Sequence, residues 1–274
     1  MKLKLQNFDI RQICESGQCF RMEKIKEDIF SIIAGERHLF IRQQGEEVEF
    51  FCEEDEFQKL WIDYFDLKSD YKIYLNEINP NDRYLMEAAR SAGGVRILRQ
   101  DLWEMIISFL ISQQNNISRI RFCIQNICEK YGKKMTGKGE FEYYAFPTPE
   151  ELSGASEEEL RTCNLGYRSK YVKRAADDIA SGKISLEKIK TMSYHRAKKE
   201  LLTIYGVGDK IAECICLFAL HHLQAFPVDT HIKQVMEQHY KRGFPNRRYK
   251  NSRGVMQQYI FYYELHKTVE SNLS

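Results

Sequence analysis

Residues 201–231 read LLTIYGVGDKIAECICLFALHHLQAFPVDTH. The first half of this stretch predicts two helices joined by a turn that contains Gly206 and Gly208, because glycine permits positive φ and close backbone approach. The amides that open the second helix point outward, and the helix dipole favours an anion there. This helix-hairpin-helix, at about residues 194–220, can therefore hold a phosphate without reading a base. An ordinary helix-capping turn is the alternative that a bare G-x-G leaves open.

Two side chains near this turn are candidates for catalysis. Lys210 lies in the first turn of the second helix, where a free amine can attack a carbon and form a Schiff base. Asp229 opens the next helix as its N-cap, and its carboxylate can also stabilise positive charge that develops on a sugar. His231, two residues later, can contact a phosphate. By position alone, a solvated lysine, a simple cap and a backbone-bound histidine remain the alternatives.

The first part of the chain has the pattern of an antiparallel sheet. Short apolar runs at 28–33, 38–41 and 48–52 are separated by turns at 34–37 and at Gly45. Runs and turns of this length predict strands that pair as hairpins.

Helical signals dominate after about residue 80. Asp101 and Glu104 have the spacing of a capping box, and apolar residues from Ile117 to Tyr131 recur at helical spacing. We therefore expect a mostly helical second part. The expected helices are 56–64, 82–92, 101–112, 117–131, 168–181, 193–203, 209–220, 230–240 and 254–268, with further helix starts at Thr148 and Ser156.

The net charge of +2 is distributed unevenly. Residues 1–85 hold 12 Lys/Arg and 18 Asp/Glu, a net of −6, whereas residues 86–274 hold 29 and 21, a net of +8. This asymmetry indicates that the second part faces a polyanion, with chance variation as the alternative. The eight cysteines form no C-x-x-C pair, so we expect free thiols in a reducing compartment and no metal site. The sequence also lacks an apolar run long enough to span a membrane and the apolar middle of a signal peptide.

Taken together, these segments resemble the helix-hairpin-helix DNA glycosylases, and most closely the 8-oxoguanine DNA glycosylases. The block from Tyr205 to His231 carries the resemblance to the superfamily. No four-cysteine cluster follows Cys216, which argues against the iron–sulfur glycosylases such as endonuclease III and the adenine glycosylases. Five further segments narrow the resemblance and fall in family order along nearly the whole chain: Ser16–Arg21, Gly94–Asp101, Ser112–Ile120, Leu165–Arg168 and Gly254–Phe261.

The resemblance implies an α+β fold in two domains. Residues 1–85 would form a twisted antiparallel sheet domain, similar to the half-fold of the TATA-binding protein. Residues 86–274 would form an all-α glycosylase body that contains the helix-hairpin-helix, with DNA lying across the turn.

The resemblance also implies a bifunctional DNA N-glycosylase and abasic-site lyase. Such an enzyme everts 8-oxoguanine opposite cytosine and cuts its glycosidic bond. Its partner would be double-stranded DNA containing oxidised guanine, and we expect a monomer without cofactor or membrane. The expected location is the cytoplasm, at the nucleoid, if the source is bacterial, and the nucleus if it is eukaryotic.

The catalytic and pocket residues follow from the same resemblance. Lys210 matches the family nucleophile that attacks C1′, and Asp229 matches the aspartate that assists departure of the base. Gly17 matches the glycine whose carbonyl accepts a hydrogen bond from N7–H of 8-oxoguanine, whereas undamaged guanine presents an acceptor at N7 and is repelled. Three residues match the walls of the base pocket: Gln257 at the Watson–Crick edge, with Phe261 and Cys214 stacking on either side. Without the resemblance, Gln257 and Phe261 would be an exposed amide and a core aromatic.

A second group of residues is implied to contact the strand opposite the lesion. Arg119 and Arg168 match the two arginines that read the orphaned cytosine, since a guanidinium can donate to its O2 and N3. Tyr167 matches the wedge beside the vacated site. Asn116 lies in the loop that fills the gap and can also cap the following helix. The family's Asn-Asn-Asn is Gln114–Asn116 here, which puts the contact from position 114 in doubt.

Two other functions remain possible at this point. The same scaffold can act chiefly on another oxidised purine, such as formamidopyrimidine guanine. Alternatively, the chain is a helix-hairpin-helix module that binds duplex DNA through phosphates at Gly206, Gly208 and His231 without catalysis. Phosphate binding does not require both Lys210 and Asp229, so their joint presence favours an enzyme.

Overall fold

The computed structural model describes residues 1–137 and 141–271. Aromatic and β-branched residues between Ile29 and Phe50 form the middle of a five-stranded antiparallel sheet with the order β1-β5-β4-β3-β2. Phe30 faces Ile41 and Ile41 faces Phe50, so apolar side chains from three neighbouring strands share one face. The strands are β1 Lys2–Lys4, β2 Met22–Lys24, β3 Ile29–Ala34, β4 Arg37–Gln44 and β5 Glu47–Phe50.

Short helices bury the apolar face of this sheet. Trp61 and Phe65 are buried, and the ring of Phe57 lies 4.9 Å from that of Phe50, centroid to centroid. The chain from 54 to 64 is helical throughout, with a π turn in its middle. The helices are α1 Ile10–Glu15, α2 Glu54–Glu56, the π turn η1 Phe57–Trp61, α3 Ile62–Tyr64 and α4 Lys72–Glu77.

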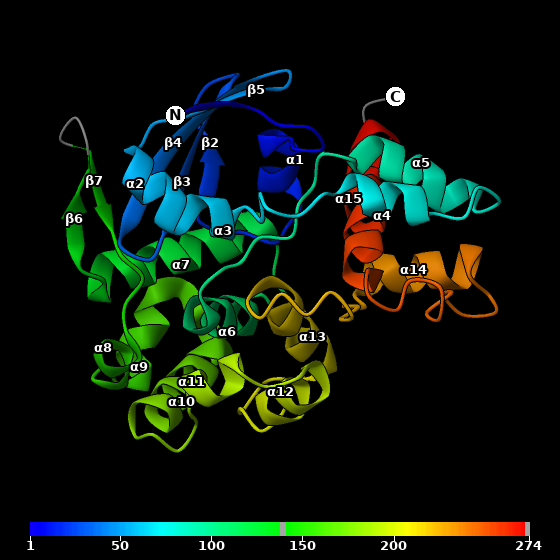
Figure 1. The fold of residues 1–274 in the computed structure, drawn as a ribbon. Coiled ribbons are helices and arrows are strands. Elements are labelled where there is room, and N and C mark those ends of the chain that lie inside the picture. Colours follow the sequence, from blue (N-terminus) through cyan, green and yellow to red (C-terminus); the bar gives the residue numbers. More distant parts are fainter. Residues whose placement is uncertain (138–140, 272–274) are drawn as a thin grey trace.

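The larger part of the molecule is helical and lies below and beside the sheet in Figure 1. Its elements are α5 Arg83–Ala92, α6 Leu102–Ile111, α7 Ile117–Tyr131, a small hairpin of β6 Lys134–Thr136 and β7 Glu142–Tyr144, α8 Pro149–Ser153, α9 Glu157–Leu160, the turns η2 Arg161–Leu165 and η3 Gly166–Arg168, α10 Ser169–Ala180, α11 Leu186–Lys190, α12 Tyr194–Leu201, α13 Asp209–Phe218, α14 Thr230–His239 and α15 Arg253–Ser271. Helix α6 is apolar nearly all round and every one of its residues is buried, so it forms the centre of the body. Helices α10 and α13 contact it, and α5 packs along α15.

A buried polar junction ties the sheet to the helical body. The Gln18 side chain accepts from the Leu98 amide at 2.8 Å and donates to the Arg96 carbonyl at 2.8 Å. The Arg96 guanidinium in turn donates to the Asp66 carbonyl at 2.8 Å. Because buried polar groups are costly unless bonded, this network holds the chain around Gly17 in one place relative to the body.

The structure confirms the expected order of an antiparallel sheet followed by helices, and the expected helices are present with bounds shifted by a few residues. All eight cysteines are free. The short elements α1, α4, α11, β1, β2 and the β6–β7 hairpin, of three to six residues each, were not predicted because they are too short to show a periodic pattern.

The expected capping box at the start of α6 is wrong in its second half. Asp101 does cap the helix, because its carboxylate accepts from the Glu104 amide at 2.9 Å. The Glu104 side chain instead turns into the interior, where its carboxylate lies 3.7 Å from the guanidinium of Arg21. Burial raises the pKa of Glu104 to about 7, against the opposing effect of Arg21.

The structure contains two apolar clusters. One lies beneath the sheet and is built from residues 8–65 together with Leu98, and the other fills the helical body and takes in Phe20 and Tyr71. The chain therefore crosses between the clusters more than once, and a boundary at 85/86 stays a prediction. Within the described residues, no helix combines the length and apolar character needed to cross a membrane.

Candidate active site

Six of the predicted site residues line one pocket in the helical body. They are Gly17, Lys210, Cys214, Asp229, Gln257 and Phe261. The pocket has a volume of about 60 Å³, well below the ~300–1,000 Å³ typical of ligand sites. A ligand the size of a nucleobase therefore enters only if the walls move apart.

Lys210 reaches the pocket from the start of α13. Gly208 caps this helix with extended backbone, so α13 starts immediately after the turn and places residue 210 in its first turn. The Lys210 ammonium lies 5.7 Å from the centroid of the Phe109 ring, and its side chain is partly exposed. Cys214, one turn further along the same face, is fully buried. Burial raises the pKa of this thiol to about 11 in spite of the positive charge on Lys210, so it presents a neutral wall.

Asp229 enters the same pocket from the start of α14. Its carboxylate accepts a hydrogen bond from the Ile232 amide at 2.9 Å, so the predicted N-cap is present. One oxygen is occupied by the cap, and the side chain is only partly exposed. Capping orients the carboxylate and places it in the positive field of the helix start. The two candidate catalytic groups thus come from the N-terminal ends of successive helices, Lys210 from the first turn of α13 and Asp229 from the cap of α14.

A buried carboxylate connects these two helices. Glu213, three residues past Lys210, accepts from the Phe226 amide at 2.7 Å and from the Tyr194 hydroxyl at 2.6 Å. The ammonium of Lys198 lies 2.6 Å from Oε1 of Glu213, the oxygen that also accepts from Tyr194, and 2.8 Å from the Asp209 carboxylate. Glu213 therefore fixes the chain that leads to Asp229 and, through α12, the orientation of the hairpin. Sequence reasoning gave no role to this residue, because a single acidic residue in a helix is usually exposed.

The backbone of Gly17 has a positive φ, a conformation that other residues adopt only with strain. Its φ is +70°, and a Cβ built on it would lie 3.0 Å from Cε1 of Phe261. The ring of Phe261 thus packs directly on the Gly17 backbone and closes the pocket. The requirement for glycine is therefore both conformational and steric.

The amide of Gln257 is fixed by its neighbours. Its Nε2 donates to the Pro227 carbonyl at 3.2 Å, and its Oε1 accepts from Nε2 of Gln258 at 3.1 Å. Gln258 is buried, and its own Oε1 has no hydrogen-bond partner among the described residues. His231 lies beside the pocket, with its ring 6.2 Å from that of Phe261 in an edge-to-face arrangement.

The residues predicted to read the opposite strand form a separate group. Arg168 is buried, and its guanidinium donates to the carbonyls of Gln113 and, at 2.9 Å, Gln114. It also lies 4.6 Å from the ring of the exposed Tyr167. Arg119 is exposed at the start of α7, where its amide donates to Asn116, so Asn116 is a cap. Arg168 is thus held by backbone carbonyls of the loop before α7.

The two glycines of the turn differ in their surroundings. A Cβ on Gly206, whose φ is +91°, would lie 2.7 Å from the ring of Tyr171. This tyrosine packs between Tyr167 and Tyr205, with centroid distances of 5.9 and 5.3 Å, and so links the turn to the opposite-strand group. Gly208 is exposed, and a Cβ built on it would meet no atom within 4 Å. Packing against Tyr171 therefore requires a glycine at position 206, whether or not a phosphate binds to the turn.

Four pocket residues were not predicted from the sequence: Phe109, Phe218, Pro227 and Gln258. The two phenylalanines stack on each other at 5.7 Å and occupy ordinary core positions of α6 and α13. Nothing in the sequence distinguishes them from other buried aromatics. Gln258 had a weak signal, because it is a polar residue on an apolar stretch of α15.

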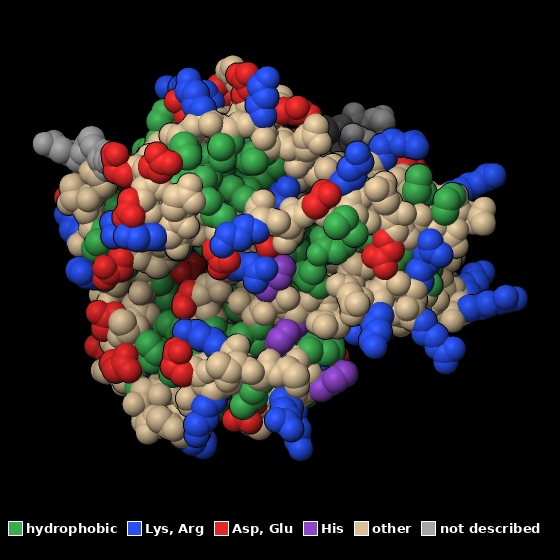
Figure 2. All heavy atoms as spheres, viewed as in Figure 1, with side chains coloured by type: hydrophobic (Ala, Val, Ile, Leu, Met, Phe, Trp, Pro, Cys, Tyr) green, Lys and Arg blue, Asp and Glu red, His purple; other side chains and the backbone are tan. Residues whose placement is uncertain are grey.

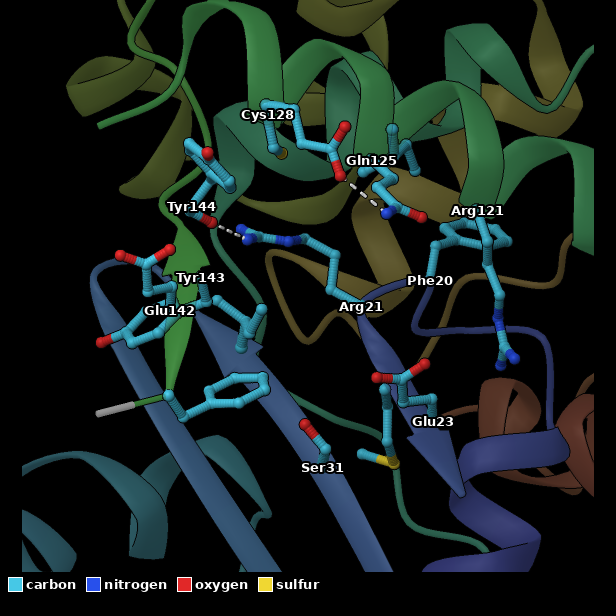
Figure 3. A pocket seen from close by; sticks show the side chains of 15 residues that line it. Phe20, Arg21, Glu23, Ser31, Arg121, Gln125, Cys128, Glu142, Tyr143 and Tyr144 are labelled. Carbon is cyan, nitrogen blue, oxygen red and sulfur yellow. Dashed lines mark hydrogen bonds between the residues drawn. The ribbon is translucent and has the colours of Figure 1, made fainter. Parts of the chain in front are cut away.

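A second cavity, of about 270 Å³, lies between strands β2 and β3, helix α7 and the β6–β7 hairpin (Figure 3). In this view Arg21 extends toward the backbone of Tyr144 and donates to its carbonyl. None of the predicted site residues lines this cavity. Within the described ranges, no cluster of three or more His, Cys, Asp or Glu side chains could hold a metal ion.

A hairpin between two helices, with a lysine and an aspartate in one pocket, defines the class of helix-hairpin-helix base excision proteins. Consistent with this, residues 107–253 match the model of the HhH-GPD superfamily of base excision DNA repair proteins. Residues 1–106 match the model described as the 8-oxoguanine DNA glycosylase N-terminal domain.

Similarity to individual proteins narrows the class. The N-glycosylase/DNA lyase of Saccharomyces cerevisiae is 32% identical, over 85% of this chain and 68% of its own length. The N-glycosylase/DNA lyase OGG1 of Arabidopsis thaliana is 31% identical, over 80% of this chain and 63% of its own. Among solved structures, the fold is similar to that of the Clostridium acetobutylicum 8-oxoguanine glycosylase/lyase, in a crystal structure with double-stranded DNA containing cytosine opposite 8-oxoguanine. The TM-score is 0.90 and the sequence identity is 37%, over 96% of this chain and 94% of the other.

The chain belongs to the 8-oxoguanine DNA glycosylase family. It spans about two thirds of the length of the two curated relatives, and nearly all of the bacterial structure.

Proposed function

We propose that this chain excises 8-oxoguanine from duplex DNA opposite cytosine, with Lys210 as the nucleophile, and then cleaves the strand by β-elimination. The observation that carries this proposal is the meeting of Lys210 and Asp229 with Gly17, Gln257 and Phe261 in one pocket. Its relatives are named as glycosylase/lyases, and a related structure holds DNA with this lesion.

The residues divide the reaction between them. The lone pair of the Lys210 amine forms a bond to C1′, while the bond from C1′ to N9 breaks and its electrons leave with the base, which takes up a proton. Asp229 stabilises the positive charge on the sugar as that bond breaks. Once the sugar ring opens, the protonated Schiff base acidifies the C2′ proton, and loss of that proton expels the 3′ phosphate.

Recognition of the damaged base is assigned to Gly17 and Gln257. Among the described residues, no donor reaches the Gly17 carbonyl, so it is free to accept from N7–H of 8-oxoguanine. Gln257 offers its amide to the Watson–Crick edge, while Phe261 and Cys214 stack on the two faces. Because the free pocket is small, Phe261 swings away from Gly17 as the everted base enters. Unstacking that base from the duplex costs a few kcal/mol.

Contacts outside the pocket bind and hold the duplex. The amides at Gly206 and Gly208 and the ring of His231 bind phosphates, and Arg119 and Arg168 pair with the orphaned cytosine. Tyr167 fills the space beside it, with Asn116 at the edge of the gap. The protein acts wherever chromosomal DNA lies, at the nucleoid of a bacterium or in a nucleus.

The direct test measures single-turnover excision from four matched duplexes. Two carry 8-oxoguanine, opposite cytosine or opposite adenine. The third carries formamidopyrimidine guanine opposite cytosine, and the fourth carries undamaged guanine. We expect 8-oxoguanine opposite cytosine to be released fastest and undamaged guanine not at all. Faster release of formamidopyrimidine guanine would favour the alternative substrate. Salt-sensitive binding without release of any base would favour a non-catalytic DNA-binding module.

Replacing Gly17 with alanine is expected to slow excision. The new methyl group meets the Phe261 ring at 3.0 Å and is held at a φ of +70°, so both the wall and the carbonyl shift. We expect a loss of about 10–100-fold in single-turnover rate, corresponding to ~1.4–2.8 kcal/mol, from the strain and the misplaced acceptor. Duplex affinity should change little. Gly182→Ala is the control, because its φ is +75° but its Cβ meets no atom within 4 Å, and it should leave the excision rate unchanged.

Replacing Glu213 with glutamine is expected to lower both stability and excision rate. The amide cannot accept from the Phe226 amide, the Tyr194 hydroxyl and Lys198 together, so ~1–3 kcal/mol of unfolding free energy is lost. Thermal melting measures this effect. The control is Glu158→Gln, an exposed position on α9 that should melt like the wild type. Well below the melting point, excision by Glu213→Gln should still be slower; an unchanged rate would show that Glu213 does not position Asp229.

A further inference from the structure

The chain that joins α14 to α15 carries a high concentration of positive charge. Residues 241–250 read KRGFPNRRYK, with five basic residues and no acidic residue. From position 230 to 252 there are six Lys/Arg and one Asp/Glu, a net of +5. Because residues 86–274 carry +8 in total, this short stretch accounts for most of the charge asymmetry of the molecule. Figure 2 shows Lys and Arg side chains gathered along this edge, where α14 lies in Figure 1.

This basic segment, residues 241–250, is held in a fixed conformation. Phe244 and Tyr249 are buried, with their ring centroids 5.5 Å apart. The Tyr249 hydroxyl accepts from the Asn79 amide at 3.1 Å, and Arg248 donates to the Glu77 carbonyl at 3.0 Å. Tyr249 and Arg248 thus attach the segment to the chain at and just after the end of α4. Phe244 packs instead against Phe226 and Tyr240, with ring centroids 4.7 and 5.2 Å away. A ligand that binds it does not have to order a flexible loop first.

The other four cations of the segment project into solvent. Lys241, Arg242, Arg247 and Lys250 are exposed, and none forms an ion pair with a described residue. Carboxylates nearby have other partners, since Glu77 accepts from Ser252 at 2.6 Å and Asp82 from the Tyr240 hydroxyl. Helix α14 itself contributes one carboxylate, Glu237, one turn before Lys241. The surface is therefore positive, preorganised and not neutralised by the protein.

The position of the segment relative to the pocket is set by α14. This helix starts at the pocket, where Asp229 caps it, and ends where the basic segment begins. Ten residues of α-helix span about 15 Å. Since B-DNA rises ~3.4 Å per base pair, this distance corresponds to four or five base pairs. The exposed Lys233 lies between the two ends of the helix.

We propose that Lys241, Arg242, Arg247 and Lys250 form a second duplex-binding surface that contacts phosphates about four to five base pairs from the everted nucleotide, on one side of the lesion. This inference rests on the proposed function, because the pocket defines where the lesion lies. The contacts are electrostatic and independent of sequence, so the surface adds affinity for any duplex and does not select the damaged base. It also helps the protein to remain on undamaged DNA while it searches.

The test replaces all four cations with glutamine and measures duplex affinity against salt. Each phosphate contact contributes about 0.9 to the slope of log K against log salt, so we expect the slope to fall by roughly 2–4. The single-turnover excision rate at saturating protein should stay at the wild-type value, because the pocket is untouched.

A second experiment uses duplexes with the lesion two base pairs from one end or from the other. Wild-type affinity should drop for one of these ends much more than for the other, and the fourfold variant should lose that difference.

The matched control removes four exposed cations elsewhere. Lys4, Lys26, Arg37 and Lys188 are exposed and form no ion pair with a described residue, so their replacement by glutamine changes the net charge equally. A control that weakens binding as much as the fourfold variant would overturn the inference, because net charge alone would then account for the effect. An unchanged slope and affinity in the fourfold variant would also overturn it, and continued excision would leave the proposed function intact. If instead the wild type excises nothing while the slope still falls, the proposed function is wrong and the binding surface stands.

Discussion

The Lys210→Gln variant is expected to lose base excision by on the order of 10³-fold or more, together with all strand cleavage. Removing a covalent nucleophile abolishes the intermediate on which both steps depend, and comparable losses in other enzymes are this large or larger. The variant should fold normally, because Lys210 is partly exposed and its contact with the Phe109 ring is worth only ~0.5–1 kcal/mol. Single-turnover kinetics on 8-oxoguanine opposite cytosine measures the effect.

A matched control separates chemistry from charge. Lys199→Gln removes an equally charged residue from the exposed side of α12, in the same hairpin, and should excise at nearly the wild-type rate. Duplex affinity should fall only slightly in both variants. Excision by Lys210→Gln within about tenfold of the wild type would mean that water or another residue attacks C1′.

The second large effect is expected for Asp229→Asn. Asparagine caps a helix as well as aspartate does, so the hydrogen bond from the Ile232 amide and the start of α14 should survive. The substitution removes the negative charge that stabilises the sugar as the base leaves. Preorganised groups of this kind are typically worth ~10²–10³-fold in rate. We expect a loss of that size in single-turnover excision, with melting temperature and duplex affinity unchanged.

Asp229→Ala distinguishes the two roles of this residue. It removes both the charge and the cap, so we expect a similar loss of rate and an additional ~1 kcal/mol of destabilisation. If Asp229→Asn excises at the wild-type rate while Asp229→Ala is unstable, Asp229 is a structural cap and has no part in the chemistry.

The fold was largely predictable because its determinants are local. The turns at 34–37 and at Gly45 separate the short apolar runs that form β3, β4 and β5, and caps such as Asp82 and Asn116 mark the starts of helices. Glu104 shows where local rules fail. Its spacing fits a capping box, but its side chain pairs across the molecule with Arg21, which no short-range pattern reveals.

The candidate site was predictable where the local sequence itself restricts the role of a residue. Lys210 and Asp229 stand at helix starts beside a double-glycine turn, and the resemblance to a known family gave Gly17 and Gln257 a place with them. The remaining walls depend on tertiary packing. Phe218 has the same local pattern as any core phenylalanine, and the closure of the pocket by Phe261 against Gly17 follows from two segments far apart in the sequence.

The most direct measurement is borohydride reduction of the protein during reaction with a duplex carrying 8-oxoguanine, followed by mass spectrometry of the adduct. We expect a covalent protein–DNA complex in which deoxyribose is attached to the Lys210 side chain. Release of base without any trapped complex, or attachment to a different lysine, would contradict the assignment of Lys210 as the nucleophile.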